Sequence, residues 1–527
     1  MFLIMSAAYV GVELQSEFGA IPPSLLPLGN RRLFQHQHAL IPAGVTKYLS
    51  LPESYSLSKM DADWLAANDI TVLPLPDGLS LGAALVAALN LVDSPLDKPL
   101  HVLFGDTLIT PLPTGNDIVS VSDVENSYNW ARINQHSTQE WLSDSSISLT
   151  QNTPIVSGYF KFSQPRQLMK CLTKRNWHFL EGLNLYKNEI GLQTVKSDNW
   201  LDFGHVNTYY TSKAKFTTQR AFNELVITPE WIEKSSSKNI KIKAEANWFE
   251  HLPATMRNFI PQFMGCHDDD GKFKYRLEYL HHTALNELYV FSELPPMVWK
   301  NIFSGCLNFI AHCQQHHAKD NDTASSLNNL FGAKTKERLM IFCDDRQFSL
   351  DDKWLFNDLS VSINEILATT EQWLPQNEDV HTVMHGDFCF SNILYDFRTN
   401  RIKTIDPRGL THDNVLTIFG DSRYDIAKLS HSVLGMYDWI IAGYYHVNIQ
   451  DNTIQFDIAG LEKQRDIQQL FVEAVSQTCH LSPMNLYAMQ IHLFLSMLPL
   501  HDDDKQRQDA LFANAFRLYQ ILVGYTQ

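Results

Sequence analysis

The sequence predicts two domains, a doubly wound α/β domain followed by an α+β domain of two lobes. At 527 residues the chain is too long for a single hydrophobic core. Apolar strands alternate with helical segments over roughly the first 215 residues, which indicates a parallel sheet covered by helices. The later segment from Val383 to Tyr395 instead places polar residues at fixed spacing between apolar ones. We therefore expect domains at residues 1–215 and 216–527, divided between residues 206 and 222, with lobes at about 216–285 and 286–527.

The composition is that of a globular protein. Hydrophobic residues make up 44% of the chain and aromatic residues 11%, which excludes a disordered chain. The formal charge of −16 argues against a nucleic-acid partner, because such a partner binds basic surfaces. The seven cysteines are odd in number and form no Cys-x-x-Cys pair, so we expect a reducing, cytoplasmic environment.

No segment is expected to enter a membrane. The opening Met1–Val10 is apolar but lacks a basic region, so it is predicted to form a buried strand. The apolar run Gly82–Val92 is too short to span a bilayer and is expected to be a helix of the core. The predicted partner is a small-molecule substrate, without nucleic acid or membrane insertion, and the oligomeric state stays open.

The elements of the first domain follow from the apolar pattern. Strands are expected at Leu3–Ala8, Ile70–Leu75 and Leu100–Asp106, and a helix at Ser80–Leu91. In sheets of this type, ligands bind outside the carboxyl ends of the strands. Because the last of these strands ends in Gly-Asp, the carboxylate of Asp106 is expected at the ligand-binding edge.

Two later segments, Val156–Phe162 and Trp200–His205, continue this pattern. With them, the domain resembles the sugar-phosphate nucleotidyltransferase family. In that family a Gly-Asp and a late Trp-x-Asp-x-Gly supply two aspartates to one magnesium ion, which the resemblance assigns to Asp106 and Asp202. It also implies a nucleoside triphosphate, such as CTP, GTP or UTP, as a substrate of this domain.

The domain departs from the family in its cationic residues. The loop Tyr9–Gly19 has no arginine, and Pro22 and Pro23 stand where the family has Pro-Lys. Without these cations the domain lacks positive charge that stabilises a phosphoryl transition state. Arg31 and Arg32 are possible substitutes. The domain is therefore either a nucleotidyltransferase or a sugar-binding or regulatory unit without that activity.

The second domain begins with short strands and helices. Its expected elements are two strands within Glu224–Lys234, a helix at Lys243–Pro253, a turn at Asp268–Gly271, a strand at Phe273–Leu280 and a helix at Pro296–Cys313. The cysteines of the last helix, and the histidines at and after its end (His312, His316 and His317), are expected to pack in the core.

The segment after Val383 carries the chemistry of this domain. Asp387 is followed five residues later by Asn392, and Asp406 ends an apolar segment one short hairpin further on. Phosphoryl transfer from a nucleotide needs one carboxylate to accept the proton of the acceptor hydroxyl. It also needs an amide and a second carboxylate to hold magnesium on the phosphates. The spacing equals that of the protein-kinase catalytic loop, with His-Gly-Asp in place of His-Arg-Asp.

These residues resemble the aminoglycoside phosphotransferase and choline kinase family, which has a two-lobed kinase-like fold. The resemblance implies ATP and Mg²⁺, with Asp387 catalytic and Asn392 and Asp406 as metal ligands. It also implies a strand lysine that reaches the phosphates and a helix glutamate that orients it, for which we expect Lys234 and Glu245. Rival candidates for this pair are Lys238, Lys241 and Glu233.

Three further residues are expected to support the site. Asp425, in a segment that resembles the family's Asp-Leu-Ala helix, is expected to cap that helix and brace the catalytic loop. His385 is expected to pack beneath the loop and orient backbone groups. Arg408 follows the metal-binding Asp406, and it either faces the phosphates or the acceptor or forms an ordinary salt bridge.

The sequence therefore predicts an ATP- and magnesium-dependent phosphotransferase that acts on a small hydroxylated metabolite, a sugar or an amino alcohol. The fused first domain would convert the product to a nucleotide-linked form for capsule or other surface polysaccharide synthesis. The alternatives are a kinase with an inert or regulatory first domain and a non-catalytic binding protein. The acceptor and the preferred nucleotide stay open.

Overall fold

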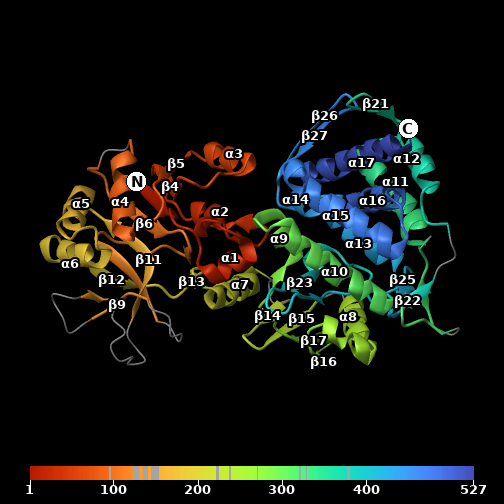
Figure 1. Ribbon diagram of the computed structural model, residues 1–527, viewed down its shortest axis with the longest axis horizontal. Helices are drawn as coiled ribbons and strands as arrows, with labels where there is room; N and C mark the ends of the chain where they lie inside the picture. The colour runs from red at the N-terminus through yellow and green to blue at the C-terminus, as the bar shows by residue number, and fades with distance from the viewer. Residues whose placement is uncertain are drawn as a thin grey trace. The chain divides into compact units, whose positions relative to one another are not determined.

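The computed structural model describes residues 1–93, 96–123, 130–134, 141–143, 154–220, 225–236, 239–269, 271–319, 322–327, 329–376 and 380–526 (Figure 1). The chain divides into two compact units, Met1–Thr217 and Thr218–Gln527. This division lies two residues after the one expected from the sequence and falls within helix α7 (Val206–Arg220).

The first unit is built on a mixed sheet. Four central strands pair in parallel in the order β6, β1, β4, β5, and β11 joins the edge of β6 in the antiparallel direction. Further pairing extends the sheet beyond β11. The strands of this sheet are β1 (Phe2–Met5), β4 (Lys47–Pro52), β5 (Ile70–Leu75), β6 (Leu100–Phe104), β8 (Ile118–Ser122), β9 (Arg132–Ile133), β10 (Leu142–Ser143), β11 (Ile155–Phe162) and β12 (Gln193–Lys196).

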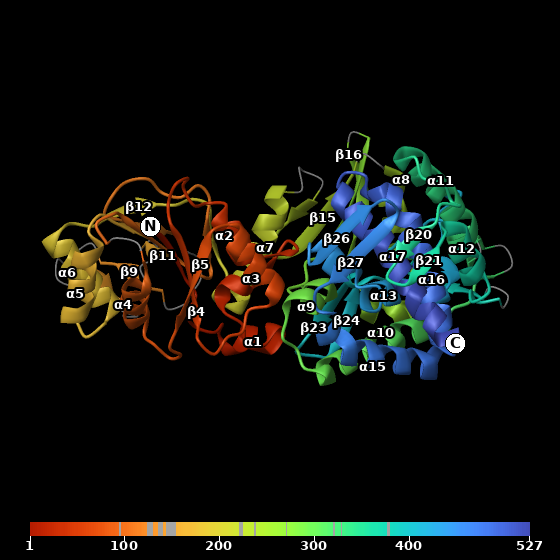
Figure 2. The same ribbon diagram turned by 90° about the horizontal axis from the view of Figure 1, so that it is seen from above.

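Helices cover both faces of this sheet. Because side chains alternate along a strand, Leu3 and Met5 pack toward α4, α5 and α6, whereas Phe2 and Ile4 pack toward α2 and α3. Figure 2 shows the sheet between these two groups of helices. The helices are α1 (Val12–Phe18), α2 (Leu33–His38), α3 (Lys59–Ala67), α4 (Leu81–Leu91), α5 (Pro165–Lys174) and α6 (Phe179–Glu189), and short strands lie at β2 (Pro27–Leu28), β3 (Arg31–Arg32), β7 (Thr107–Ile109) and β13 (Trp200–Asp202).

The second unit opens with a four-stranded antiparallel sheet and one helix. The strands pair in the order β14 (Leu225–Ile227), β15 (Trp231–Ser235), β17 (Lys272–Glu278) and β16 (Phe263–Asp269). Helix α8 (Asn239–His251) begins four residues before the predicted start, and its Ala244 and Trp248 are buried as the helical spacing predicts. The Trp248 indole donates to the Met384 carbonyl at 2.8 Å, which ties this helix to the segment that carries the predicted chemistry.

The rest of the second unit is mainly helical. Its helices are α9 (Leu285–Phe291), α10 (Pro296–Cys313), α11 (Lys334–Arg346), α12 (Ile363–Glu371), α13 (Arg423–Val433), α14 (Tyr437–Ile441), α15 (Leu461–Cys479), α16 (Pro483–Met497) and α17 (Lys505–Thr526). Its strands are β18 (Thr283–Ala284), β19 (Ala324–Ser325), β20 (Trp354–Phe356), β21 (Leu359–Val361), β22 (His381–Val383), β23 (Ile393–Asp396), β24 (Arg401–Thr404), β25 (Phe419–Asp421), β26 (Tyr445–Gln450) and β27 (Thr453–Ile458).

Helix α10 has the predicted bounds, but its histidines differ from the expectation. Cys306 and Cys313 are fully buried, as expected of core residues. His312 and His316 are only partly buried and His317 is exposed, because His312 is not on the buried face of the helix and the other two follow its end. Across the described residues, no helix is both long enough and apolar enough to cross a bilayer.

Candidate active site

The loop between β22 and β23 is held in place from beneath by a buried carboxylate. Asp425, in the first turn of α13, accepts hydrogen bonds from the backbone amides of His385 and Gly386, both at 2.8 Å. Asp425 was expected both to cap the helix and to brace the loop. It braces the loop, but the residue at the cap position of the helix is Ser422. Removing its carboxylate would leave two buried amides without partners.

His385 is a structural residue of this loop. Its Nδ1 lies 3.3 Å from the Asp387 amide and its Nε2 lies 2.9 Å from the Ile405 carbonyl. Because an amide can only donate and a carbonyl can only accept, the ring is neutral with its proton on Nε2. Burial lowers the pKa of His385 to about 4, so the ring stays neutral at physiological pH.

Two glycines, one in this loop and one after β24, allow the chain to approach its neighbours closely. Gly386 has a φ of +78°, and a side-chain carbon there would lie 2.7 Å from Cβ of Arg408. Gly409 has a φ of +62°, and a side-chain carbon there would lie 2.3 Å from the Ala244 carbonyl of α8. Both positions therefore require glycine, for conformation and for space.

Asp387 is an ionised carboxylate with two polar partners. The Asn392 amide nitrogen donates to the Asp387 carbonyl at 2.9 Å and to its Oδ2 at 3.1 Å. The Lys428 ammonium lies 2.7 Å from Oδ1. Although burial would raise the pKa of Asp387, the ion pair with Lys428 holds it below its ordinary value. The side chain remains 41% exposed, so a substrate hydroxyl can reach it.

Asp406 lies beside the predicted lysine and glutamate. It follows β24 and has a φ of +55°, a left-handed conformation uncommon for aspartate and frequent at functional sites. Lys234 Nζ lies 3.0 Å from Asp406 Oδ1 and 2.7 Å from Glu245 Oε2. The Tyr275 hydroxyl donates to the same Glu245 oxygen at 2.7 Å. Although burial opposes it, the two carboxylates hold the pKa of Lys234 above its ordinary value.

The rival candidates for the phosphate-binding lysine and its glutamate partner lie in different surroundings. Glu233 is paired with Arg276 at 2.7 Å, on the sheet and away from Lys234. Lys241 lines the same cavity as Lys234, from the first turn of α8. Lys238 lies outside the described residues. The structure thus brings Lys234 and Glu245 together, with Lys241 as a further cation nearby.

The oxygen atoms of Asn392 and Asp406 suit a magnesium ion. The Asn392 nitrogen donates to Asp387, and its oxygen accepts from Ser391 Oγ at 3.4 Å, which leaves this oxygen a second lone pair for a ligand. Among the described residues, Oδ2 of Asp406 has no hydrogen-bond partner, and this side chain is 43% exposed. Amide and carboxylate oxygens are the donors that Mg²⁺ prefers. These two residues therefore fit the predicted metal.

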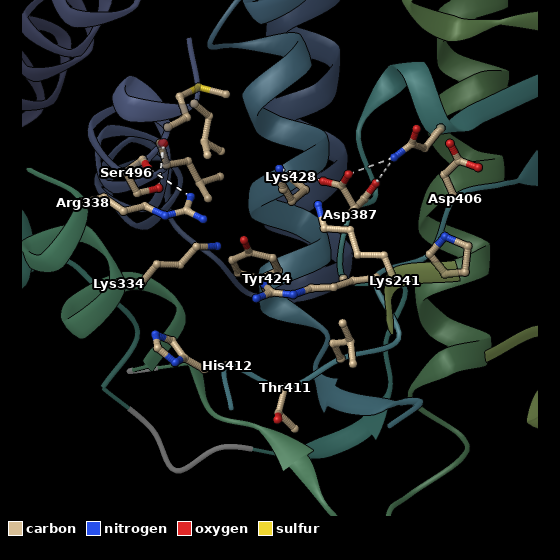
Figure 3. Close-up of a pocket in the computed structure, with 18 of the residues that line it drawn as sticks. Lys241, Lys334, Arg338, Asp387, Asp406, Thr411, His412, Tyr424, Lys428 and Ser496 are labelled. Atoms are coloured by element: carbon tan, nitrogen blue, oxygen red, sulfur yellow. Dashed lines mark hydrogen bonds and ion pairs between the residues drawn. The ribbon is translucent and has the colours of Figure 1, made fainter. Parts of the chain in front are cut away.

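One cavity of about 670 Å³ is lined by Lys234, Glu245, Asp387, Asn392 and Asp406. Figure 3 shows Asp387 and Asp406 on its walls. Its walls also hold residues that the sequence analysis missed: Lys334, Arg338, Thr411, His412, Tyr424 and Lys428. Lys428 could have been found, because it lies three residues after Asp425 on α13 and therefore near the same face of the helix. Arg408 also lines the cavity, and among the described residues it has no carboxylate within 4.0 Å, so it is not an ordinary salt-bridge partner.

The first unit brings Asp106 and Asp202 together. Strand β13, which ends at Asp202, pairs with β7 directly after Asp106, and the Phe203 amide donates to the Asp106 carbonyl at 2.8 Å. A side-chain carbon on Gly204 would lie only 2.6 Å from Oδ2 of Asp106. Burial and the nearby Asp202 raise the pKa of Asp106 to about 6.

This pair of carboxylates fits a divalent cation. Among the described residues, Oδ2 of Asp202 is buried without a hydrogen bond, and the imidazole Nδ1 of His205 lies 3.6 Å from it. Two adjacent carboxylates repel each other unless a cation or a proton lies between them. The structure thus brings Asp106 and Asp202 together, and the shared metal ion stays a prediction.

Of the two possible substitutes for the missing cations, Arg32 is held within the fold. Arg32 is buried, and its guanidinium donates to the Leu25 carbonyl at 2.8 Å and lies 3.4 Å from Asp61. Arg31 is exposed on the short strand β3. The guanidinium of Arg32 is therefore used in contacts within the fold. Pro23 begins a short 3₁₀ turn and carries no charge.

The chain is similar to solved structures of two kinds. One is a nucleoside-diphosphate-sugar pyrophosphorylase from Vibrio cholerae, with 14% identity and a TM-score of 0.32 over 40% of this chain and 99% of that one. An inositol-1-phosphate CTP transferase from T. maritima has 14% identity and a TM-score of 0.32 over 41% of this chain and 96% of that one. An aminoglycoside-3'-phosphotransferase of type VIII has 14% identity and a TM-score of 0.32 over 55% of this chain and 99% of that one. No protein-family model and no curated protein sequence matches the chain.

Proposed function

We propose that this chain is an ATP- and magnesium-dependent phosphotransferase that phosphorylates a hydroxyl group of a small metabolite. The observation that carries the proposal is that Asp387, Asn392 and Asp406 share one cavity with the Lys234–Glu245 ion pair. These are the groups that phosphoryl transfer requires, and they come from elements far apart in the sequence.

Each group has a distinct role in this proposal. Asp387 orients the acceptor hydroxyl and accepts its proton. Lys234, held by Glu245, binds the phosphates of ATP, and Asn392 with Asp406 would hold Mg²⁺. When bound, the magnesium ion neutralises charge on the transferred phosphoryl group. His385 and Asp425 fix the loop that presents Asp387.

Replacing Asp406 should weaken nucleotide binding. Asp406→Ala removes a predicted metal ligand and one carboxylate beside Lys234, so we expect the Kd for Mg-ATP to rise about tenfold or more. Calorimetric titration of Mg-ATP into the full chain measures this. Asp413→Ala is the matched control, because Asp413 is exposed and lies outside the walls of the cavity. Equal affinities of the two variants would contradict the assignment of Asp406.

The function itself is tested by a screen for acceptor-dependent ATP consumption. Sugars, amino alcohols and their acidic derivatives are incubated with the full chain and Mg-ATP, and phosphorylated products are identified by mass spectrometry. An acceptor that is phosphorylated by the unchanged protein and not by Asp387→Asn supports the proposal. If Mg-ATP does not bind at all, the phosphotransferase proposal fails.

For the first unit we propose transfer of a nucleotide to the phosphorylated product. The Asp106–Asp202 pair supports this activity, and the absence of a lysine at Pro23 opposes it. Such a fusion would supply nucleotide-linked precursors for surface polysaccharide. The full chain given ATP, acceptor and CTP, GTP or UTP would then release pyrophosphate. A phosphorylated acceptor that persists with all of these triphosphates present would instead indicate an inert or regulatory unit.

The Asp106–Asp202 pair predicts a pH dependence of stability without metal. Because folding raises the pKa of Asp106 to about 6, the folded chain binds more protons than the unfolded chain between about pH 4 and 6. Stability in EDTA should therefore fall as the pH rises through this range, by about 1–3 kcal/mol. Asp106→Asn should remove this part of the pH dependence and raise Tm at pH 7 in EDTA.

Thermal unfolding in EDTA and in Mg²⁺, at pH 5 and pH 7, measures this effect. Mg²⁺ should stabilise the unchanged protein more than Asp106→Asn. Asp198→Asn is the control, since Asp198 is exposed and close in sequence to Asp202. If Asp106→Asn and Asp198→Asn respond alike to pH and to Mg²⁺, the two carboxylates do not form a metal site.

A further inference from the structure

The cavity around Asp387 contains positive charge that no carboxylate neutralises. Lys334, Arg338 and Arg408 all line it, and among the described residues none of them has a carboxylate within 4.0 Å. Lys334 is held over the Tyr424 ring, 5.9 Å from its centre, and Arg338 donates to the Ser496 carbonyl at 3.1 Å. Buried or half-buried cations are usually paired, so three unpaired ones in one cavity need an explanation.

The charges in this cavity contrast with those of the whole chain. The chain carries a formal charge of −16, yet the cavity is lined by six lysines and arginines against four aspartates and glutamates. Burial and repulsion from Arg408, Arg338 and Lys428 lower the pKa of Lys334. Although burial opposes it, Lys334, Lys428 and Arg408 lower the pKa of the Tyr424 hydroxyl. The neighbouring cations contribute to both shifts, in line with the excess of positive charge among the lining residues.

Of the four carboxylates, three are already paired with a lysine. Glu245 and Asp406 pair with Lys234, and Asp387 pairs with Lys428. The fourth, Glu337, is mostly exposed and lies 3.8 Å from His412. The surplus of positive charge therefore lies on the side formed by α11 and the segment after Asp406.

This side is separate from the proposed phosphate-binding groups. Lys334 and Arg338 are four residues apart on α11, so they project from one face of the helix. In Figure 3 their side chains point into the cavity on the far side of Tyr424 from Asp406, and Asp387 lies between. A substrate that extends from Asp387 toward α11 would thus meet Lys334 and Arg338.

We propose that the acceptor carries an acidic group, a carboxylate or a phosphate, and that Lys334, Arg338 and Arg408 bind it. This inference rests on the proposed phosphotransferase function and narrows its substrate to acidic hydroxylated metabolites. In the reaction, the bond from the γ-phosphorus of ATP to its bridging oxygen breaks and a bond to the acceptor oxygen forms. The hydroxyl proton passes to Asp387 and ADP leaves. A cationic amino alcohol would be repelled by the same three residues.

Binding of a simple anion tests the site without a known acceptor. Inorganic phosphate and, separately, acetate are titrated calorimetrically into the full chain saturated with Mg-ADP. We expect one site, weakened about tenfold or more by Lys334→Gln and by Arg338→Gln, which keeps a donor for the Ser496 carbonyl. The ion that binds with the lower Kd indicates whether the acidic group of the acceptor is a phosphate or a carboxylate.

Lys336→Gln is the matched control for these variants. Lys336 lies on the same helix, is exposed and pairs with Glu371 outside the cavity. Its replacement removes the same charge but should leave anion binding unchanged. Absence of binding to the unchanged protein, or equal binding by Lys334→Gln and Lys336→Gln, would overturn the inference.

Turnover separates this inference from the proposed function. Glycerol, glycerate, glycerol 3-phosphate and ethanolamine, together with glucose, gluconate and glucose 6-phosphate, are compared as acceptors. We expect phosphorylation among the acidic compounds, with a KM that Lys334→Gln raises about tenfold or more and Lys336→Gln does not. Phosphorylation confined to neutral or cationic acceptors would overturn the inference and leave the phosphotransferase standing. If the chain does not bind Mg-ATP but the nucleotide-free chain binds phosphate or acetate in a way that depends on Lys334, the phosphotransferase proposal fails and the anion site remains.

Discussion

Asp387→Asn is expected to reduce turnover by about two to four decades, the range for the loss of a general base. The amide has nearly the size of the carboxylate but cannot accept the proton of the acceptor hydroxyl. The affinity for Mg-ATP should change little, because Asn392, Asp406 and Lys234 remain in place. Steady-state assays of the two proteins with the identified acceptor, together with calorimetric titration of Mg-ATP, measure both quantities.

The matched control is Asp413→Asn, which makes the same exchange at an exposed position outside the cavity. It should retain both the turnover and the Mg-ATP affinity of the unchanged protein. Wild-type turnover in Asp387→Asn would show that this carboxylate is not the base. A loss of Mg-ATP binding in the same variant would instead show that Asp387 serves the nucleotide rather than the acceptor.

The parts of the site that the sequence predicts are those within a single local motif. The spacing from Asp387 to Asn392 spans one loop, and Asp406 follows one hairpin later, so short connections constrain where these side chains can lie. Lys234 and Glu245 were assigned from the family resemblance, with Lys238, Lys241 and Glu233 as rivals, and the structure places the two side chains 2.7 Å apart. In each case few residues separate the groups, and hydrophobic periodicity indicates which face of the element is buried.

The residues that escaped prediction come from elements distant in sequence. Lys334 and Arg338 reach the cavity from α11, about fifty residues before Asp387. Periodicity shows that a helix has a buried face but not which cavity its remaining side chains border. Arg32 was a possible substitute for the missing cations, but its guanidinium donates to the Leu25 carbonyl and lies 3.4 Å from Asp61. The position of Lys334 and Arg338 at the cavity and the contacts of Arg32 both depend on tertiary packing, which local sequence patterns do not predict.

Lys428 is the missed residue with the largest expected effect. Its ammonium lies 2.7 Å from Asp387 and is the main cause that holds the pKa of this carboxyl low. In Lys428→Met, which keeps a similar shape, the burial of Asp387 is no longer offset and its pKa should rise. The carboxylate would then be protonated over part of the working pH range, so the acid limb of the profile of kcat/KM against pH should move to higher pH.

Lys428→Met should also lower turnover at pH 8 by about two decades, since a cation is lost 2.7 Å from Asp387 and therefore near the acceptor hydroxyl to which the phosphoryl group is transferred. Lys428→Arg is the conservative control, and it should keep the acid limb near that of the unchanged protein because the positive charge remains beside Asp387. Profiles of kcat and kcat/KM against pH for the three proteins measure both effects. An acid limb that stays in place in Lys428→Met would show that Lys428 does not set the ionisation of Asp387. A loss of turnover without that movement would mean that Lys428 acts only on the phosphoryl group.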